Sequence, residues 1–405
     1  MDRGRVIRDR SILALVAAEV VSQIGSQMSA LALPWFVLVT TGSATKMGLV
    51  FAAELLPVAV LGIPSGAVVQ KLGARSSMLL ADLVRAPLVA LVPLLHELGA
   101  LSFGILLAVA AAHGLFSTAY FTCQRLILPE VVGEDEQLIA QANSVIEGAT
   151  SVTQFLGPAL AGVFIAWLGA ANVLWLDAAS YLVSFIIVLA FVRVHGKTPQ
   201  GEEARGIWAG LRYVRRDRLV AQASLSSLVY GFLFRILTAS FPVLAFEQYD
   251  RNPRVAGWLA ASFGVGAVAG SAAAYRLVTQ VAPMRLAALA AIGIAAPLWL
   301  LVPHVPLLVI LAALAVCGAS IPLVNAPYLG MLSSRVPRAL RAKVIQSLLT
   351  INNLAGPLGF VIAGPLFVHA GLHPTYAIVA ALATFATLNF IAAVAYEEPV
   401  AQEAA

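Results

Sequence analysis

The chain has 405 residues, of which 60% are hydrophobic and 11% are charged, and its mean hydropathy is +0.90. Soluble domains carry about 25% charged residues, so this composition excludes a soluble globular protein and indicates one embedded in a lipid bilayer. The basic loops of such a protein account for the net charge of +5, and we expect no nucleic-acid partner.

Twelve apolar stretches follow one another along the chain, and each is long enough to cross a bilayer, which takes about 20 mostly apolar helical residues. The predicted helices cover 12–40, 46–69, 76–95, 101–122, 138–168, 171–192, 219–246, 254–276, 284–303, 306–330, 343–369 and 373–396. The first stretch exceeds the roughly 7–15-residue apolar core of a signal peptide, so we expect it to remain as the first helix.

A glycine motif in the fifth predicted helix returns in the eleventh. It runs from Gly157 to Gly162 in the first half and from Gly359 to Gly364 in the second. Duplication of six helices is the plan of many secondary transporters. The sequence therefore predicts an all-α integral membrane protein in which twelve transmembrane helices form two pseudo-symmetric six-helix bundles.

The longest segment outside the predicted helices, 193–218, joins the two halves. Within it, apolar residues recur at helical spacing among arginines over 207–216, which is typical of a basic amphipathic helix on a membrane surface. We thus predict an N-terminal bundle over 1–192, this cytoplasmic linker, and a C-terminal bundle with a short cytoplasmic tail over 219–405.

The basic residues indicate how these helices are oriented. Alternate loops hold 20 of the 25 Lys and Arg residues, whereas the opposite loops hold only Lys46, Arg251 and Arg254. Short basic loops stay in the cytoplasm, so we place both termini on the cytoplasmic side of the inner cell membrane. The two remaining basic residues, Arg85 and Arg235, fall inside predicted helices.

Polar side chains form stripes along several predicted helices. Glu19, Gln23 and Gln27 recur at intervals of four, which places them on one helix face. Polar residues in lipid normally face a cavity or the bundle interior, although hydrogen bonding between helices is an alternative use of them. The candidates for the lining of a central substrate cavity are Gln23, Gln27, His113, Tyr120, Gln154, Arg235, Asn325, Tyr328 and Asn353.

Three carboxylates lie deep within predicted helices, namely Glu19, Glu54 and Glu147. An acid in the membrane can carry a proton, so all three are candidates for proton coupling. Each could instead be a structural acid that pairs with a basic residue of another helix, and Arg235 is the obvious partner.

Asp82 and Arg85 are three residues apart, which lets them pair along one helix face, either as part of an intracellular gate or as a simple satisfied pair. In the fifth helix Gly157, Pro158 and Gly162 permit close helix approach and local kinks. The two cysteines lie far apart and form no metal-ligand pattern, so we expect neither a metal nor a cofactor.

Several of these segments resemble the major facilitator superfamily, and within it the drug and natural-product efflux branch that includes macrolide exporters and the enterobactin exporter. The resemblance rests on the segments 22–25, 41–43, 81–86, 128–130, 142–144 and 177–181, together with the glycine motif from Gly157. The loop that contains Gly66, Gly73 and Arg75 is similar to the signature gating loop of the superfamily, although Gln70 stands where an aspartate is usual.

This resemblance implies a secondary transporter, acting as a monomer, that exports an amphipathic drug or secondary metabolite in exchange for protons by alternating access. An importer, or a transporter of nutrients or lipids, would share the same helices. A membrane-embedded enzyme is a further alternative, but the sequence has no clustered Cys, His and Glu residues for metal hydrolysis. It also lacks the GxxxxGK loop of an ATP-driven pump.

Overall fold

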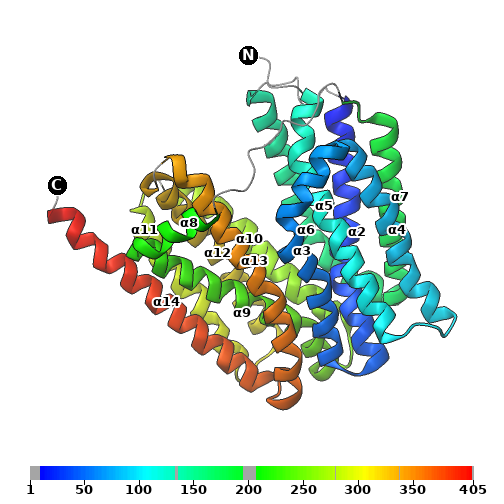
Figure 1. Cartoon of the computed structure of the whole chain (residues 1–405). Coiled ribbons are helices and arrows are strands. Elements are labelled where there is room, and N and C mark those ends of the chain that lie inside the picture. Colours follow the sequence, from blue (N-terminus) through cyan, green and yellow to red (C-terminus); the bar gives the residue numbers. More distant parts are fainter. Residues whose placement is uncertain (1–9, 133–135, 195–206, 279, 337, 404–405) are drawn as a thin grey trace. The chain divides into compact units, whose positions relative to one another are not determined.

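The computed structural model describes residues 10–132, 136–194, 207–278, 280–336 and 338–403, and the ordered elements within these ranges are all helical (Figure 1). The chain divides into two compact units. Unit 1 comprises residues 1–203 and 249–257, and unit 2 comprises residues 204–248 and 258–405.

Unit 1 contains six long helices. They are α2 (Arg10–Thr41), α3 (Ala44–Leu72), α4 (Ala74–Glu97), α5 (Phe103–Val132), α6 (Glu136–Leu168) and α7 (Ala170–Phe191). The junction between α3 and α4 is Gly73, whose φ of +83° is accessible to glycine but strained for other residues. The chain can therefore turn from one helix into the next without an intervening loop.

Unit 2 begins with the short helix α8 (Ile207–Arg216), in which Val214 is buried while Arg212, Arg215 and Arg216 are exposed. The long helices are α9 (Arg218–Gln248), α10 (Pro253–Leu277, of which the first five residues belong to unit 1), α11 (Pro283–Ala295), α12 (Leu307–Arg335), α13 (Arg338–His369) and α14 (Leu372–Glu403). α11 continues directly into the 3₁₀-helix η1 (Ala296–Leu301).

These helices confirm the predicted all-helical fold, with three larger differences from the expected bounds. α5 continues to Val132, beyond its expected end at 122. The stretch expected as one helix over 284–303 is α11 plus η1, because Pro297 has no N–H group with which to continue the α-helical hydrogen bonds. α14 continues to Glu403, beyond its expected end at 396. Within the described residues, nine helices are long and apolar enough to cross a membrane.

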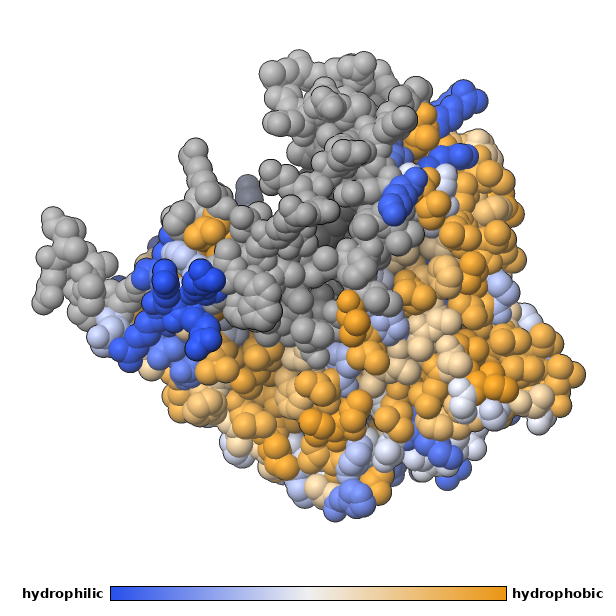
Figure 2. Space-filling view, in the orientation of Figure 1, coloured by the Kyte–Doolittle hydropathy of each residue, from blue (hydrophilic) through white to orange (hydrophobic). Residues whose placement is uncertain are grey.

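The surface carries large apolar side chains that a soluble protein would bury. Leu56 and Ile186 in unit 1 and Leu289 and Leu388 in unit 2 are all more than half exposed. Figure 2 shows apolar side chains over much of the coloured surface. In a bilayer these side chains face lipid, so the helices are held together by close packing and polar contacts rather than by the hydrophobic effect.

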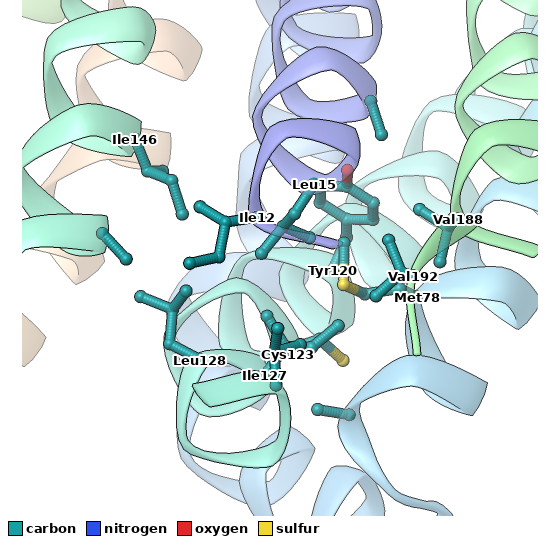
Figure 3. Packing of buried hydrophobic residues seen from close by; sticks show 14 of the residues in the cluster. Ile12, Leu15, Met78, Tyr120, Cys123, Ile127, Leu128, Ile146, Val188 and Val192 are labelled. Carbon is teal, nitrogen blue, oxygen red and sulfur yellow. The ribbon is translucent and has the colours of Figure 1, made fainter. Parts of the chain in front are cut away.

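The core of unit 1 illustrates this packing. Ile12 and Leu15 of α2 meet Met78 of α4, Tyr120 of α5 and Val188 of α7, each at most 2% exposed (Figure 3). The free thiol of Cys123 lies in the same cluster and is fully buried, so this cysteine is a packing residue.

Glycines bring pairs of helices into backbone contact. A Cβ atom added at Gly114 of α5 would overlap the carbonyl oxygen of Glu54 in α3. In unit 2, Cβ atoms at Gly266 and Gly270 of α10 would overlap carbonyl oxygens of α12. α3 and α5 are the second and fourth long helices of unit 1, and α10 and α12 are the second and fourth of unit 2. The two units therefore pack equivalent helices together through glycine contacts.

We predict that Gly114→Ala forces α3 and α5 apart and destabilises the fold by about 1–3 kcal/mol, the usual cost of overpacking. The control is Gly104→Ala in the same helix, where the nearest atom to the new Cβ is the Ser102 Oγ at 4.0 Å. Thermal unfolding of both variants in detergent should show a lower midpoint for Gly114→Ala only. Equal midpoints would contradict the tight contact.

Candidate functional site

Unit 1 encloses an ion pair in a nearly water-free setting. Asp82 and Arg85 of α4 are 0% and 3% exposed and form a salt bridge. The second carboxylate oxygen of Asp82 accepts a hydrogen bond from the Ser184 hydroxyl at 2.8 Å. The Arg85 guanidinium also lies 4.1 Å from the ring centre of Tyr120 and 4.3 Å from that of Tyr181, so two aromatic faces add to its stabilisation.

A chain of polar groups runs beside this pair and joins four helices. The Glu54 carboxylate of α3 lies 3.1 Å from Nδ1 of His113 in α5, and Nε2 of the same ring lies 2.9 Å from the Tyr181 hydroxyl of α7. The Tyr181 hydroxyl is in turn 2.9 Å from the Ser26 hydroxyl of α2. Both nitrogens of His113 are therefore engaged, one by an acid and the other by a phenol.

Two further acids are buried nearby with incomplete hydrogen bonding. Glu19 of α2 is 1% exposed, and neither carboxylate oxygen makes a hydrogen bond of normal geometry with a described residue, although Gln23 and Tyr120 lie beside it. Asp177 of α7 is 0% exposed; one of its oxygens is 3.3 Å from the Ser180 hydroxyl, while the other has no partner among the described side chains. Unit 1 thus holds several acids that need compensation in their ionised form.

Unit 2 contains a cavity of about 350 Å³ that opens among α9, α10, α11, α12 and α14. Its wall is mainly apolar and aromatic, with Phe234 and Phe263 packed at 5.0 Å between ring centres. Polar groups on the wall are few and include Arg235, Asn325 and Tyr328. The Tyr328 hydroxyl lies 2.9 Å from the Ser224 hydroxyl, which fixes its direction.

The relatives of this chain agree with this architecture. The model of the family described as "Transmembrane secretion effector" matches residues 7–403. The chain belongs to this family. The multidrug efflux pump Tap of Mycolicibacterium fortuitum is 30% identical to it over 382 residues, which cover 90% of this chain and 91% of the pump.

Solved structures show the same fold at low sequence identity. The nucleoside transporter NupG has a TM-score of 0.75 at 12% identity, with 94% of this chain and 98% of that chain covered. A D-xylose–proton symporter has a TM-score of 0.72 at 15% identity, with 94% and 96% covered. The protein is therefore a multi-pass membrane transporter of the major facilitator superfamily, in a family that includes efflux transporters, and it is not an enzyme.

The predicted cavity residues of this secretion effector family transporter are distributed over both units. Arg235, Asn325 and Tyr328 line the cavity of unit 2. His113 lies in the polar chain of unit 1, and Tyr120 lies in the core beneath Arg85. Two predicted cavity residues, Gln154 and Asn353, have side chains outside the described part of the structure, as does one predicted coupling acid, Glu147.

Gln23 is buried beside Glu19, and the Gln27 side chain packs against Gly157 of α6, where an added Cβ would overlap it. A Cβ at Gly162 would lie 3.0 Å from the Cα of Gly257, which belongs to the segment 249–257 of unit 1. Pro158 lies in α6 between Gly157 and Gly162. These contacts give the glycine motif a close-packing role.

In the signature loop, the guanidinium of Arg75 donates a hydrogen bond of 2.9 Å to the carbonyl oxygen of Leu189 in α7. Gly73 provides the junction of α3 and α4, and the surroundings of Gly66 lie outside the described side chains. Among the residues that the structure describes, no group of three or more His, Cys, Asp or Glu could hold a metal ion.

Ser26 of α2 had no place in the predicted site, and neither had two residues of the polar network on α7, Tyr181 and Ser184. Their spacing from Asp177, four and seven residues, puts all three on one face of α7. This polar stripe is the feature of the sequence that could have identified Tyr181 and Ser184, since its period matches that of the stripe on α2. What the sequence could not supply was the rotation of α7 that turns this face toward Arg85.

We predict that Asp82→Asn destabilises the transporter by about 3–5 kcal/mol, because it leaves the buried Arg85 without a counter-ion. The double variant Asp82→Leu with Arg85→Met should recover much of this loss, since it removes both charges. Thermal unfolding in detergent measures each effect. If the single variant unfolds at the same temperature as the wild type, the ion pair does not contribute to the stability of the fold.

Proposed function

We propose that this transporter exports an amphipathic small molecule, a drug or secondary metabolite, in exchange for protons. It works by alternating access as a monomer in the inner cell membrane, with both termini in the cytoplasm. The observation that carries the proton coupling is the burial of Glu19 without a hydrogen bond of normal geometry to any described side chain.

An ionised carboxylate in this position lacks the hydrogen bonds that would replace its lost hydration, whereas the protonated form needs far less compensation. Glu19 is therefore suited to hold a proton while the unit is closed around it and to release the proton when water reaches it. Its neighbour Tyr120 also contacts Arg85, so a change of charge at Glu19 would alter the electrostatic environment of the Asp82–Arg85 pair.

Glu54 and His113 support the same proposal by offering a route for protons. The Glu54 side chain is 31% exposed and the His113 side chain 10%, so their contact leads from an accessible acid toward the buried Tyr181. Histidine can take up a proton on one nitrogen and release one from the other. Glu147 remains a third proposed coupling acid on the grounds of its position in α6.

The cavity of unit 2 supports an amphipathic substrate, because sites for small molecules are mostly apolar with a few polar groups that fix orientation. Its volume of about 350 Å³ falls at the lower end of the usual range for such sites. We further propose that Asp82 and Arg85, the loop with Gly66, Gly73 and Arg75, and the glycine motif of α6 govern the change between the two access states.

Export is the preferred direction because Tap, a relative along almost the whole chain, is named a multidrug efflux pump. The fold itself does not set the direction, since a D-xylose–proton symporter shares it. Import of a nutrient or movement of a lipid is accordingly the second candidate function.

We predict that Glu19→Gln keeps the protein folded but abolishes exchange driven by a pH gradient, because the amide cannot release a proton. Purified protein in proteoliposomes, with substrate flux followed after an imposed pH jump, provides the measurement. The control is Glu97→Gln, which replaces an exposed acid at the end of α4. Undiminished pH-driven flux in Glu19→Gln would remove this residue from the coupling mechanism.

The direction of transport is tested in an efflux-deficient bacterial host challenged with a panel of lipophilic antibiotics and dyes. We expect the wild type to raise the inhibitory concentration of at least one compound, and both Glu19→Gln and a proton uncoupler to cancel this protection at matched expression. Sensitisation of the host, rather than protection, would favour an importer.

A further inference from the structure

Arg235 of α9 lies in the wall of the unit 2 cavity, and no carboxylate among the described side chains lies beside it. Its guanidinium lies 5.8 Å from the ring centre of Phe360, and this is the one charged or aromatic interaction it makes within the described part of the chain. A contact of this length is near the outer limit of cation–π attraction. Since arginine stays charged in proteins, the cavity contains a positive charge that is almost uncompensated.

The helices around the cavity carry few acids, and those of α14 lie near its C-terminal end, from Glu397 onward. Helices α9 to α13 contain a single Asp or Glu residue, Glu247. Glu247 is twelve residues beyond Arg235 in α9, about 18 Å along the helix axis at 1.5 Å per residue. Unit 1 differs sharply, because Arg85, which lies in the middle of a predicted span, has an adjacent carboxylate.

The internal repeat shows that this charge is not part of the shared packing. Gly157 and Gly359 begin the two copies of the glycine motif, and each packs against the first long helix of its half. A Cβ at Gly157 would overlap Gln27, and a Cβ at Gly359 would lie 2.9 Å from the Cβ of Arg235. Both contacted residues also precede a helix proline by seven positions, so Arg235 occupies the place that the neutral Gln27 holds in unit 1.

We propose that Arg235 binds an acidic group of the transported molecule, which makes the substrate an amphipathic organic anion. The guanidinium offers several N–H donors to a carboxylate or sulfonate, while Phe234, Phe263 and Tyr230 provide the apolar wall for the rest of the molecule. This inference rests on the proposed transport function and adds the charge of the substrate to it.

Three probes that share one fluorophore test the charge preference: dansyl-phenylalanine, which is an anion, its neutral amide, and the cation dansylcadaverine. Each is titrated at equilibrium, without a pH gradient, against the full-length protein in lipid nanodiscs. We expect the wild type to bind the anion roughly ten- to a hundredfold more tightly than the amide, as a hydrogen-bonded charge predicts.

Arg235→Gln installs the side chain of the equivalent position in unit 1 and should reduce the affinity for the anion to that for the amide, whereas Arg235→Lys should retain part of the preference. The control is Arg218→Gln at the exposed start of α9, which should bind all probes as the wild type does. Equal affinity of the wild type for anion and amide, a preference that survives Arg235→Gln, or no binding of any probe would each overturn the proposal.

Thermal stability separates substrate binding from a structural role. Removal of a charge that has no partner should leave the unfolding temperature of Arg235→Gln unchanged or raise it, because no counter-ion is stranded. A marked fall would instead identify a structural ion pair, for example with an acid of unit 1, and would overturn the proposal. Because binding is measured without a proton gradient, loss of pH-driven flux with intact anion preference would refute only the proposed coupling.

Discussion

A charge within a membrane-spanning helix has to be compensated inside the protein, because the surrounding hydrocarbon provides neither water nor counter-ions. In unit 1 this constraint is met at Arg85, which combines the Asp82 carboxylate with the faces of Tyr120 and Tyr181. Three groups from three helices must converge to satisfy one guanidinium. The same convergence brings Glu19 beside Tyr120 and His113 beside Tyr181, so the coupling candidates are positioned by the compensation of a single charge.

Glycine contacts supply the close approach that this convergence needs. The backbone contact of Gly114 with Glu54 brings α3 onto α5 and sets the acid within reach of His113, the residue preceding Gly114. In unit 2 the corresponding helices α10 and α12 pack through glycines in the same way. Small residues therefore act indirectly on the chemistry, since they fix how near two helices carrying polar groups can come.

The two units have diverged in charge while retaining their packing. Unit 1 buries Glu19, Asp82 and Asp177, whereas unit 2 has an apolar cavity with Arg235 as its charged group in the described wall. A duplicated fold allows such a division because each half can keep its helix contacts while polar residues change at equivalent positions. The pair Gln27 and Arg235 illustrates this, with one packing contact and two different charges.

The sequence alone determined the helices, because a local run of about 20 apolar residues is sufficient for a helix to cross the hydrocarbon core of a bilayer. It also determined the Asp82–Arg85 pair, whose members are three residues apart on one helix. Only the tertiary structure joined Glu54 to His113, 59 residues away, and placed Tyr181 against Arg85. It alone also showed that Arg235 has no carboxylate partner among the described side chains. These contacts depend on how each helix is rotated and how closely it approaches its neighbours, and neither quantity follows from a single helix's own pattern.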